Sequence, residues 1–169
     1  MRLVAAEAGV AVQTVYFTFG TKADLLAAVE EHAVLGDWSR ADFFARWAEQ
    51  LRLETDARAL TKSFVANDTA VKQRLAPLVH AIGRFLPADT ANNERRDTGR
   101  DRFFRSYVER LLDLGALRTG LTPERALDIV NALNSLASFT ELTRRRGWSA
   151  DEWGAWMCET LVGQLIAIR

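Results

Sequence analysis

Cysteine and histidine are scarce in this chain, and the other residue types that perform catalysis form no recognisable arrangement. It has one cysteine, Cys158, and two histidines, so the usual Cys/His zinc sets cannot be built. We find no nucleophile with a base and an orienting acid, no glycine-rich phosphate loop and no metal-ligand spacing. We therefore expect no enzyme and no cofactor, and we interpret Cys158 as a small core residue.

Two short apolar segments near the N-terminus have helical spacing and are joined by a turn that contains Gly9. The first runs from Leu3 to Ala8 and the second from Val12 to Thr18. Their size and pattern are typical of a helix-turn-helix, whose second helix enters the major groove of DNA. The same corner occurs in helical proteins that never touch DNA, so the pattern alone leaves both interpretations open.

The composition is that of an ordinary globular protein, with 49% hydrophobic and 26% charged residues in a chain of 169. The formal net charge is zero, so DNA binding would depend on local geometry and not on a global positive field. The apolar runs are too short to cross a bilayer, and Met1 is not followed by the apolar run of a secretory signal. We expect a cytoplasmic protein that is not in a membrane.

Scarce prolines and scarce β-branched runs favour an all-α fold. Thr21 with Asp24 and Ser149 with Glu152 have the spacing of capping boxes, which open helices. The apolar spacing predicts helices over residues 3–8, 12–18, 22–35, 38–53, 57–65, 71–85, 104–115, 123–142 and 149–168, with a bend at Pro77 and a polar connection over Pro87–Asn93.

The run from Val4 to Leu26, VAAEAGVAVQTVYFTFGTKADLL, closely resembles the signature of the tetracycline-repressor (TetR) family. That signature has the form A-x-x-A-G-V-S-x-x-T-[IL]-Y-x-[HY]-F-x-[ST]-K-x-x-L-L. Residues 115–124 and 146–161 are similar to the regulatory domain of a large TetR subgroup. The resemblance implies a helix-turn-helix DNA-binding domain over residues 1–35, incomplete at its N-terminus, and a ligand-binding and dimerisation domain over residues 36–169.

The resemblance also assigns roles along the recognition helix. Thr14 and Tyr16 would donate hydroxyl hydrogen bonds to phosphates, and Lys22 would add a charged contact. Gln13 would read an adenine edge. The further candidates for base contacts are Val12, Phe17 and Thr18. For Thr14 and Tyr16 a packing or capping role is the alternative.

Three departures from the signature bear on DNA binding. Ala11 stands where the family usually has a serine cap, and Thr18 replaces the usual His or Tyr. By this resemblance the chain would begin inside the family's second helix, so the family's first helix would have no counterpart. Before Gly36 there are two basic residues against four acidic ones, which is poor for binding phosphates.

The resemblance places a small-molecule pocket among the helices from Trp38 to Gly115. A ligand pocket is mostly apolar with a few polar groups. The candidates of this kind are Trp47, Phe64, His80, Phe103, Phe104, Tyr107 and Asn131. For His80, a satisfied core or surface histidine is the alternative.

The last two helices would pair with those of a second subunit as a four-helix bundle. Residues 126–142 are apolar on more than one side, so they must bury two faces. The interface candidates are Leu133, Leu136, Phe139, Trp156, Leu161 and Leu165. Each of them could instead belong to the core of its own domain.

The sequence therefore predicts a ligand-responsive transcriptional regulator, a repressor that binds a palindromic operator as a homodimer. Its partners would be operator DNA and a small-molecule effector. The alternative is a dimeric helical protein that binds small molecules but not DNA, because the first helix is missing. The acidic balance before Gly36 favours that alternative.

Overall fold

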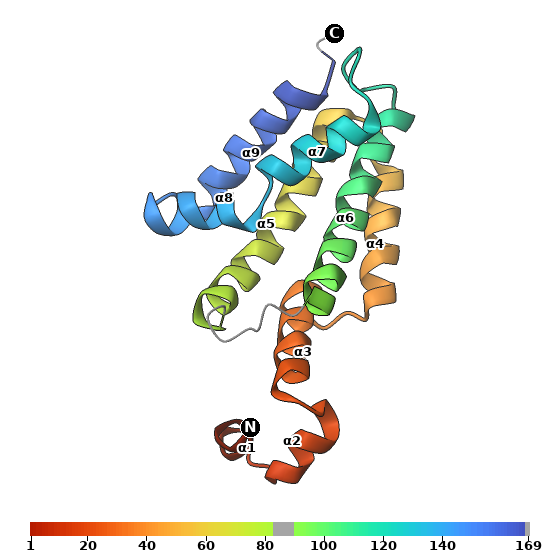
Figure 1. Cartoon of the computed structure of the whole chain (residues 1–169). Coiled ribbons are helices and arrows are strands. Elements are labelled where there is room, and N and C mark those ends of the chain that lie inside the picture. The colour runs from red at the N-terminus through yellow and green to blue at the C-terminus, as the bar shows by residue number, and fades with distance from the viewer. Residues whose placement is uncertain (83–89, 168–169) are drawn as a thin grey trace.

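A computed structural model describes the backbone of residues 1–82 and 90–167, and the side chains of 1–81 and 99–167. Over these residues the regular secondary structure is helical, apart from an isolated antiparallel bridge between Leu117 and Ile166. The predicted all-α fold class is therefore confirmed. Figure 1 shows two regions, a small corner at the N-terminal end and a larger bundle.

The N-terminal corner is built from α1 (Arg2–Glu7) and α2 (Val12–Phe19), and α3 (Lys22–Leu35) leads from it into the bundle. Gly9 and Gly20 take φ values of 65° and 71° between these helices, a backbone region that glycine enters without the steric cost other residues meet. The predicted capping box opens α3: Thr21 Oγ accepts from Asp24 N at 3.1 Å, and Thr21 N donates to Asp24.

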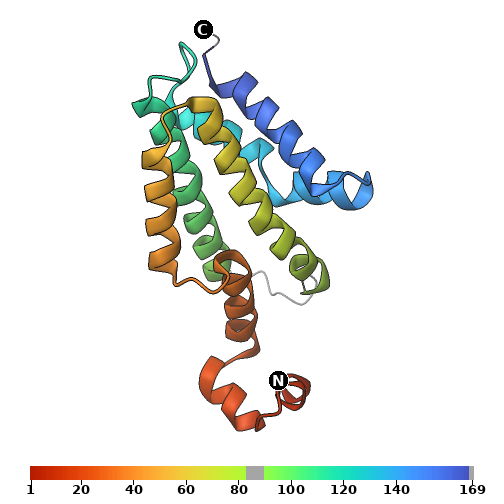
Figure 2. The same ribbon diagram turned by 180° about the vertical axis from the view of Figure 1, so that it is seen from behind.

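The bundle is formed by α4 (Arg40–Leu53), α5 (Ala57–Ile82) and α6 (Thr90–Asp113), with α7 (Pro123–Leu133) and α9 (Ala150–Leu165) crossing the same core. Figures 1 and 2 show α4, α5 and α6 lying alongside one another, with α9 next to α5 on the opposite side from α4. A short α8 (Leu136–Thr140) continues into one turn of π-helix, Glu141–Arg145.

Helix α5 corrects the prediction of two separate helices over residues 57–85. It runs without interruption from Ala57 to Ile82 and contains Pro77. Phe85, which the second predicted helix included, lies outside the described residues. The polar stretch between the two predicted helices is instead part of one long helix.

That polar stretch stays helical because its side chains find partners within α5. Asp68, Thr69 and Lys72 are all buried. The Thr69 hydroxyl donates to the carbonyl of Val65 at 2.7 Å, and Lys72 forms an ion pair with Asp68 one turn earlier. Buried polar groups of this kind are tolerated when they are paired.

Two other predicted boundaries are also wrong. Helix α6 begins at Thr90, so the last four residues of the predicted polar connection are helical; the first three lie outside the described residues. The predicted helix over residues 123–142 is broken after Leu133. Ser135 starts a new helix there, because its side chain accepts from the backbone N–H of Ser138 at 3.1 Å.

The core of the bundle contains an aromatic cluster. Phe64 stacks on Tyr107 with ring centroids 4.1 Å apart, and Phe103 lies 5.3 Å from Phe64 and 4.4 Å from Trp47. The polar atoms of the tyrosine and the tryptophan have hydrogen-bond partners. The Tyr107 and Thr61 hydroxyls are 2.8 Å apart, and the Trp47 indole N–H donates to Ser106. This cluster fixes α4, α5 and α6 relative to one another.

Among the helices described here, none combines the length and the apolar character that a membrane span requires.

Replacing Leu161 on α9 by alanine should lower the free energy of unfolding by about 2–5 kcal/mol, because a fully buried leucine would leave a cavity. Gln164→Ala on the same helix is the matched control, since Gln164 is exposed, and it should change stability by about 0.5 kcal/mol or less. Urea unfolding of both variants measures the difference. Equal stabilities would show that α9 is not packed as described.

Candidate functional site

Helix α2 exposes the side chains that the sequence selected for contact with DNA. Phe17 is 94% exposed and Tyr16 is 52% exposed, whereas Val15, which precedes them, is buried. Gln13, Thr14, Thr18 and Lys22 are exposed as well, and Val12 is half-buried. The helix therefore has one face that holds the corner together and another that is available to a partner.

Exposure weakens the packing alternative for Tyr16, since half of that side chain is outside the protein. Thr18 is different, because its hydroxyl donates to the carbonyl of Thr14 at 2.9 Å. A binding partner would therefore contact the methyl group of Thr18, because the hydroxyl already donates within the helix. Ala11 caps α2 with an extended backbone and no side-chain hydrogen bond, as expected for an alanine in place of serine.

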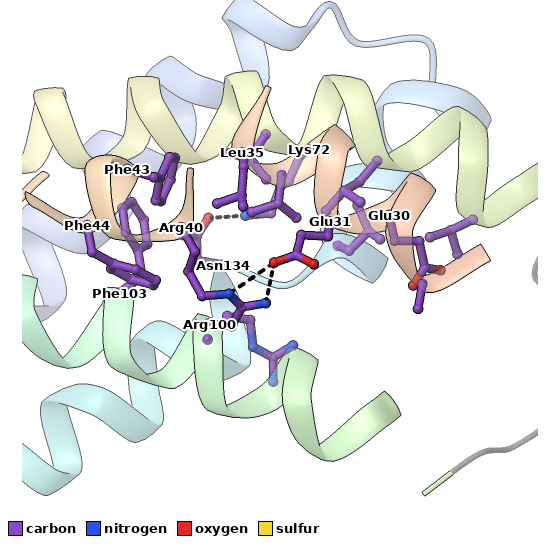
Figure 3. A pocket seen from close by; sticks show the side chains of 17 residues that line it. Glu30, Glu31, Leu35, Arg40, Phe43, Phe44, Lys72, Arg100, Phe103 and Asn134 are labelled. Atoms are coloured by element: carbon purple, nitrogen blue, oxygen red, sulfur yellow. Dashed lines mark hydrogen bonds and ion pairs between the residues drawn. The ribbon is translucent and has the colours of Figure 1, made fainter. Parts of the chain in front are cut away.

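A cavity of about 580 Å³ lies where α3 enters the bundle, within the range of drug-sized ligand sites. Figure 3 shows Phe43, Phe44 and Phe103 gathered at one end of it and Glu30 at the other. Its wall includes Ala27, Glu30, Glu31, Val34 and Leu35 of α3; Arg40, Phe43 and Phe44 of α4; Val71, Lys72, Leu75 and Val79 of α5; Gly99, Arg100 and Phe103 of α6; and Asn134 and Leu136.

A buried polar group forms part of this wall. Lys72 pairs with Asp68 and also donates to Asn134 Oδ1 at 3.2 Å. Burial, with Arg100 nearby, lowers the pKa of Lys72 well below its ordinary value. At the edge, Arg40 holds Glu31 through two hydrogen bonds of 2.8 and 3.0 Å, and both side chains are about half exposed.

Most of the cavity wall lies among the helices from Trp38 to Gly115, as the resemblance implied, but the residues chosen for it differ. Of the seven predicted pocket residues only Phe103 lies in its wall. The correction has a simple cause: the other aromatic candidates, Trp47, Phe64, Phe104 and Tyr107, pack against each other in the core. His80 is exposed, and the Asn131 amide donates to the carbonyl of Leu127.

Glu30, Lys72 and Asn134 were not predicted as wall residues, because charged and amide side chains are taken as solvated when the sequence shows no partner for them. One signal was available. Asp68 and Lys72 are four residues apart, which is the spacing of a helical ion pair. The contact with Asn134, 62 residues further along the chain, has no such signal.

Helix α3 connects the exposed corner to the cavity. Five residues of the cavity wall belong to α3. The far end of the helix is held by Arg74 of α5, whose guanidinium donates to the carbonyls of Ala33 at 2.7 Å and Val34 at 3.1 Å. A cation at this position satisfies carbonyls that a helix end leaves unpaired. A shift of α5 against α3 would thus be transmitted to α2.

Three of the six predicted interface residues belong to the core of the chain instead. Phe139 is 4% exposed, and Leu161 and Leu165 are fully buried, since α9 packs on α5 and α7. Leu133 and Trp156 are half-buried, and Leu136 lies in the cavity wall. Of the six predicted residues, Leu133, Leu136 and Trp156 are therefore the ones that could contact a second subunit without repacking of the core.

Residues 1–29 match a family model described as "Bacterial regulatory proteins, tetR family". The match covers α1, α2 and the first half of α3, and it confirms the resemblance on which the helix-turn-helix prediction depends. Proteins of that family are DNA-binding regulators and not enzymes. No curated protein and no solved structure matches the chain.

The Arg74 contact predicts a change in local dynamics. Arg74→Met keeps the apolar stem but removes both hydrogen bonds, so hydrogen exchange of backbone amides over residues 29–36 should become faster. Arg58→Met, an exposed arginine near the start of the same helix, is the control and should leave this segment unchanged. Unaltered protection in Arg74→Met would show that Arg74 does not hold the end of α3.

Proposed function

We propose that the chain is a transcriptional regulator that binds operator DNA through α2 and responds to a small molecule in the cavity under α3. The observation that carries the proposal is the position of α3. The first part of this helix belongs to the segment that matches the regulatory family, and its second part forms a wall of the cavity. One rigid helix therefore contacts both candidate sites.

The exposed face of α2 supports a role as the reading helix. Phosphates would accept from Thr14, Tyr16 and Lys22, which fix the orientation of the helix on the duplex. Gln13 has a donor and an acceptor for an adenine edge, and Phe17 extends an apolar ring toward a thymine methyl. With few basic residues in the corner, specificity has to come from these contacts more than from charge.

The response to a ligand follows from differential binding. A molecule in the cavity touches α3, and it shifts the DNA-bound equilibrium only if it binds one position of α3 better than another. In a dimer, a changed tilt of α3 would alter the separation of the two reading helices. They would then no longer fit half-sites one helical turn, roughly 34 Å, apart. Ligand binding would release the operator, which is the behaviour of a repressor.

We further propose that the protein acts in the cytoplasm as a homodimer with residues 1–35 as its DNA-binding domain and residues 36–169 as its regulatory domain. The half-buried side chains Leu133 and Trp156 support a subunit contact near α7 and α9. Trp156 is already oriented by Trp148, which meets it edge to face at 5.9 Å. A large aromatic ring that is ordered but partly exposed is a common feature of subunit contacts.

Binding to DNA from the gene's own upstream region tests the proposal. Gln13→Ala should weaken binding by about 1–3 kcal/mol and relax the sequence preference at one base pair. Lys22→Ala should instead weaken binding to all sequences alike and reduce the salt slope by about one. Fluorescence anisotropy at several salt concentrations measures both effects, and Lys62→Ala, on an exposed part of α5, is the control for lost charge.

A second candidate function has support in the charge balance, because residues 1–35 contain two basic residues against four acidic ones. In this second function the chain is a helical protein that binds a small molecule but not DNA. It would be supported if the folded chain bound the upstream DNA no more tightly than random DNA and still bound a compound in its cavity. The regulator proposal would then be wrong.

A further inference from the structure

Asn134 is the polar residue on which the chemistry of the cavity depends. It is fully buried and forms part of the cavity wall at the point where α7 ends. Its Oδ1 accepts from Lys72 Nζ at 3.2 Å, and Lys72 is itself the donor of the ion pair with Asp68. Because a lysine ammonium offers only donors, this contact fixes which end of the amide faces Lys72.

The other end of the amide is a donor that the protein does not use. Among the described side chains and backbone, no atom accepts a hydrogen bond from Asn134 Nδ2, although that atom is buried. A buried donor without a partner is costly, and an acceptor brought by a ligand would remove that cost. A carbonyl or ether oxygen satisfies the donor without adding charge.

The described charges around the cavity balance one another. Among the side chains that the structure describes, the wall contains Arg40, Lys72 and Arg100 against Glu30 and Glu31, and Asp68 lies behind Lys72, so three basic side chains balance three acidic ones. Arg40 is paired with Glu31, and Lys72 with Asp68. A ligand ion would lose its hydration here without gaining an uncompensated opposite charge.

The rest of the wall favours aromatic or aliphatic groups. Phe43 meets Phe44 edge to face at 5.5 Å and lies 6.4 Å from Phe103, so three rings form one end of the cavity. Val71, Leu75 and Val79 line it along α5. Aromatic rings of a ligand that packed between these side chains would gain ring–ring interaction energy in addition to the hydrophobic energy of the area they bury.

From these observations we infer that the cavity takes an uncharged, largely apolar aromatic compound with one hydrogen-bond acceptor, which Asn134 binds through its Nδ2–H. The inference deepens the proposed function, since it rests on this cavity as the effector site. The ligand contacts the phenylalanine rings with its apolar body and Asn134 with its acceptor. Lys72 acts as a positioning residue, because it orients the amide without touching the ligand.

Three compounds of nearly one shape test the inference: benzophenone, diphenylmethane and 4-benzoylbenzoate. Benzophenone has the carbonyl acceptor, diphenylmethane has a CH₂ in its place, and 4-benzoylbenzoate adds a negative charge. Isothermal titration calorimetry of the whole chain should give a Kd for benzophenone about tenfold lower than for diphenylmethane, corresponding to about 1.4 kcal/mol. The carboxylate should bind at least tenfold more weakly than benzophenone.

Two variants assign the effect to Asn134. Asn134→Leu keeps the approximate size and removes the amide, and Asn134→Asp keeps an acceptor for Lys72 but has no N–H donor. Both should bind benzophenone and diphenylmethane with equal affinity. Asn131→Leu is the matched control, since Asn131 is on α7 outside the cavity wall, and it should keep the tenfold preference.

The inference is overturned if the native protein binds the two neutral compounds equally, prefers the carboxylate or binds none of the three. It is also overturned if folded Asn134→Asp keeps the preference; circular dichroism establishes which variants are folded. These titrations contain no DNA, so their outcome is separate from that of the proposed function. Preference for benzophenone together with absent operator binding would support the cavity chemistry and contradict only the regulator.

Discussion

The attachment of α3 to the bundle is the constraint on which the rest of the structure depends. The helix begins at a capping box next to the exposed corner and ends where Arg74 takes the carbonyls of Ala33 and Val34. Between those ends it contributes five residues to the cavity wall. If α3 moves as a rigid rod, a molecule that changes the fit between α3 and α5 would also change the direction of α2.

The same region contains charges that are expensive to bury. The pair of Lys72 with Asp68 gives little net stability, because the cost of removing two ions from water offsets their attraction. Its position suggests another role. The break after Leu133, where Ser135 caps a new helix, brings the Asn134 amide within reach of Lys72. The pair thereby orients an amide in the cavity wall while leaving the region without net charge.

Local signals in the sequence were sufficient for most of the fold. The capping boxes at Thr21 and Ser149 are present, because a cap involves residues only three positions apart. The continuous helix α5 was missed, since its middle is polar and its buried side chains are accommodated by pairing within the helix, Lys72 with Asp68 and Thr69 with the carbonyl of Val65. The cavity was missed for a related reason: periodicity identifies apolar faces but not which rings pack together and which border a space. The exposed face of α2 was anticipated, because the TetR resemblance covers that segment continuously.

Reciprocal linkage is the most direct measurement of the central claim, that α3 couples the cavity to the reading helix. The Kd for operator DNA is measured with and without saturating benzophenone, and the Kd for benzophenone with and without saturating DNA. If α3 couples the two sites, both ratios should have the same value, between about 5 and 150, with each ligand weakening the binding of the other. Ratios of one, with both ligands bound at once, would contradict it, because the two sites would then be independent.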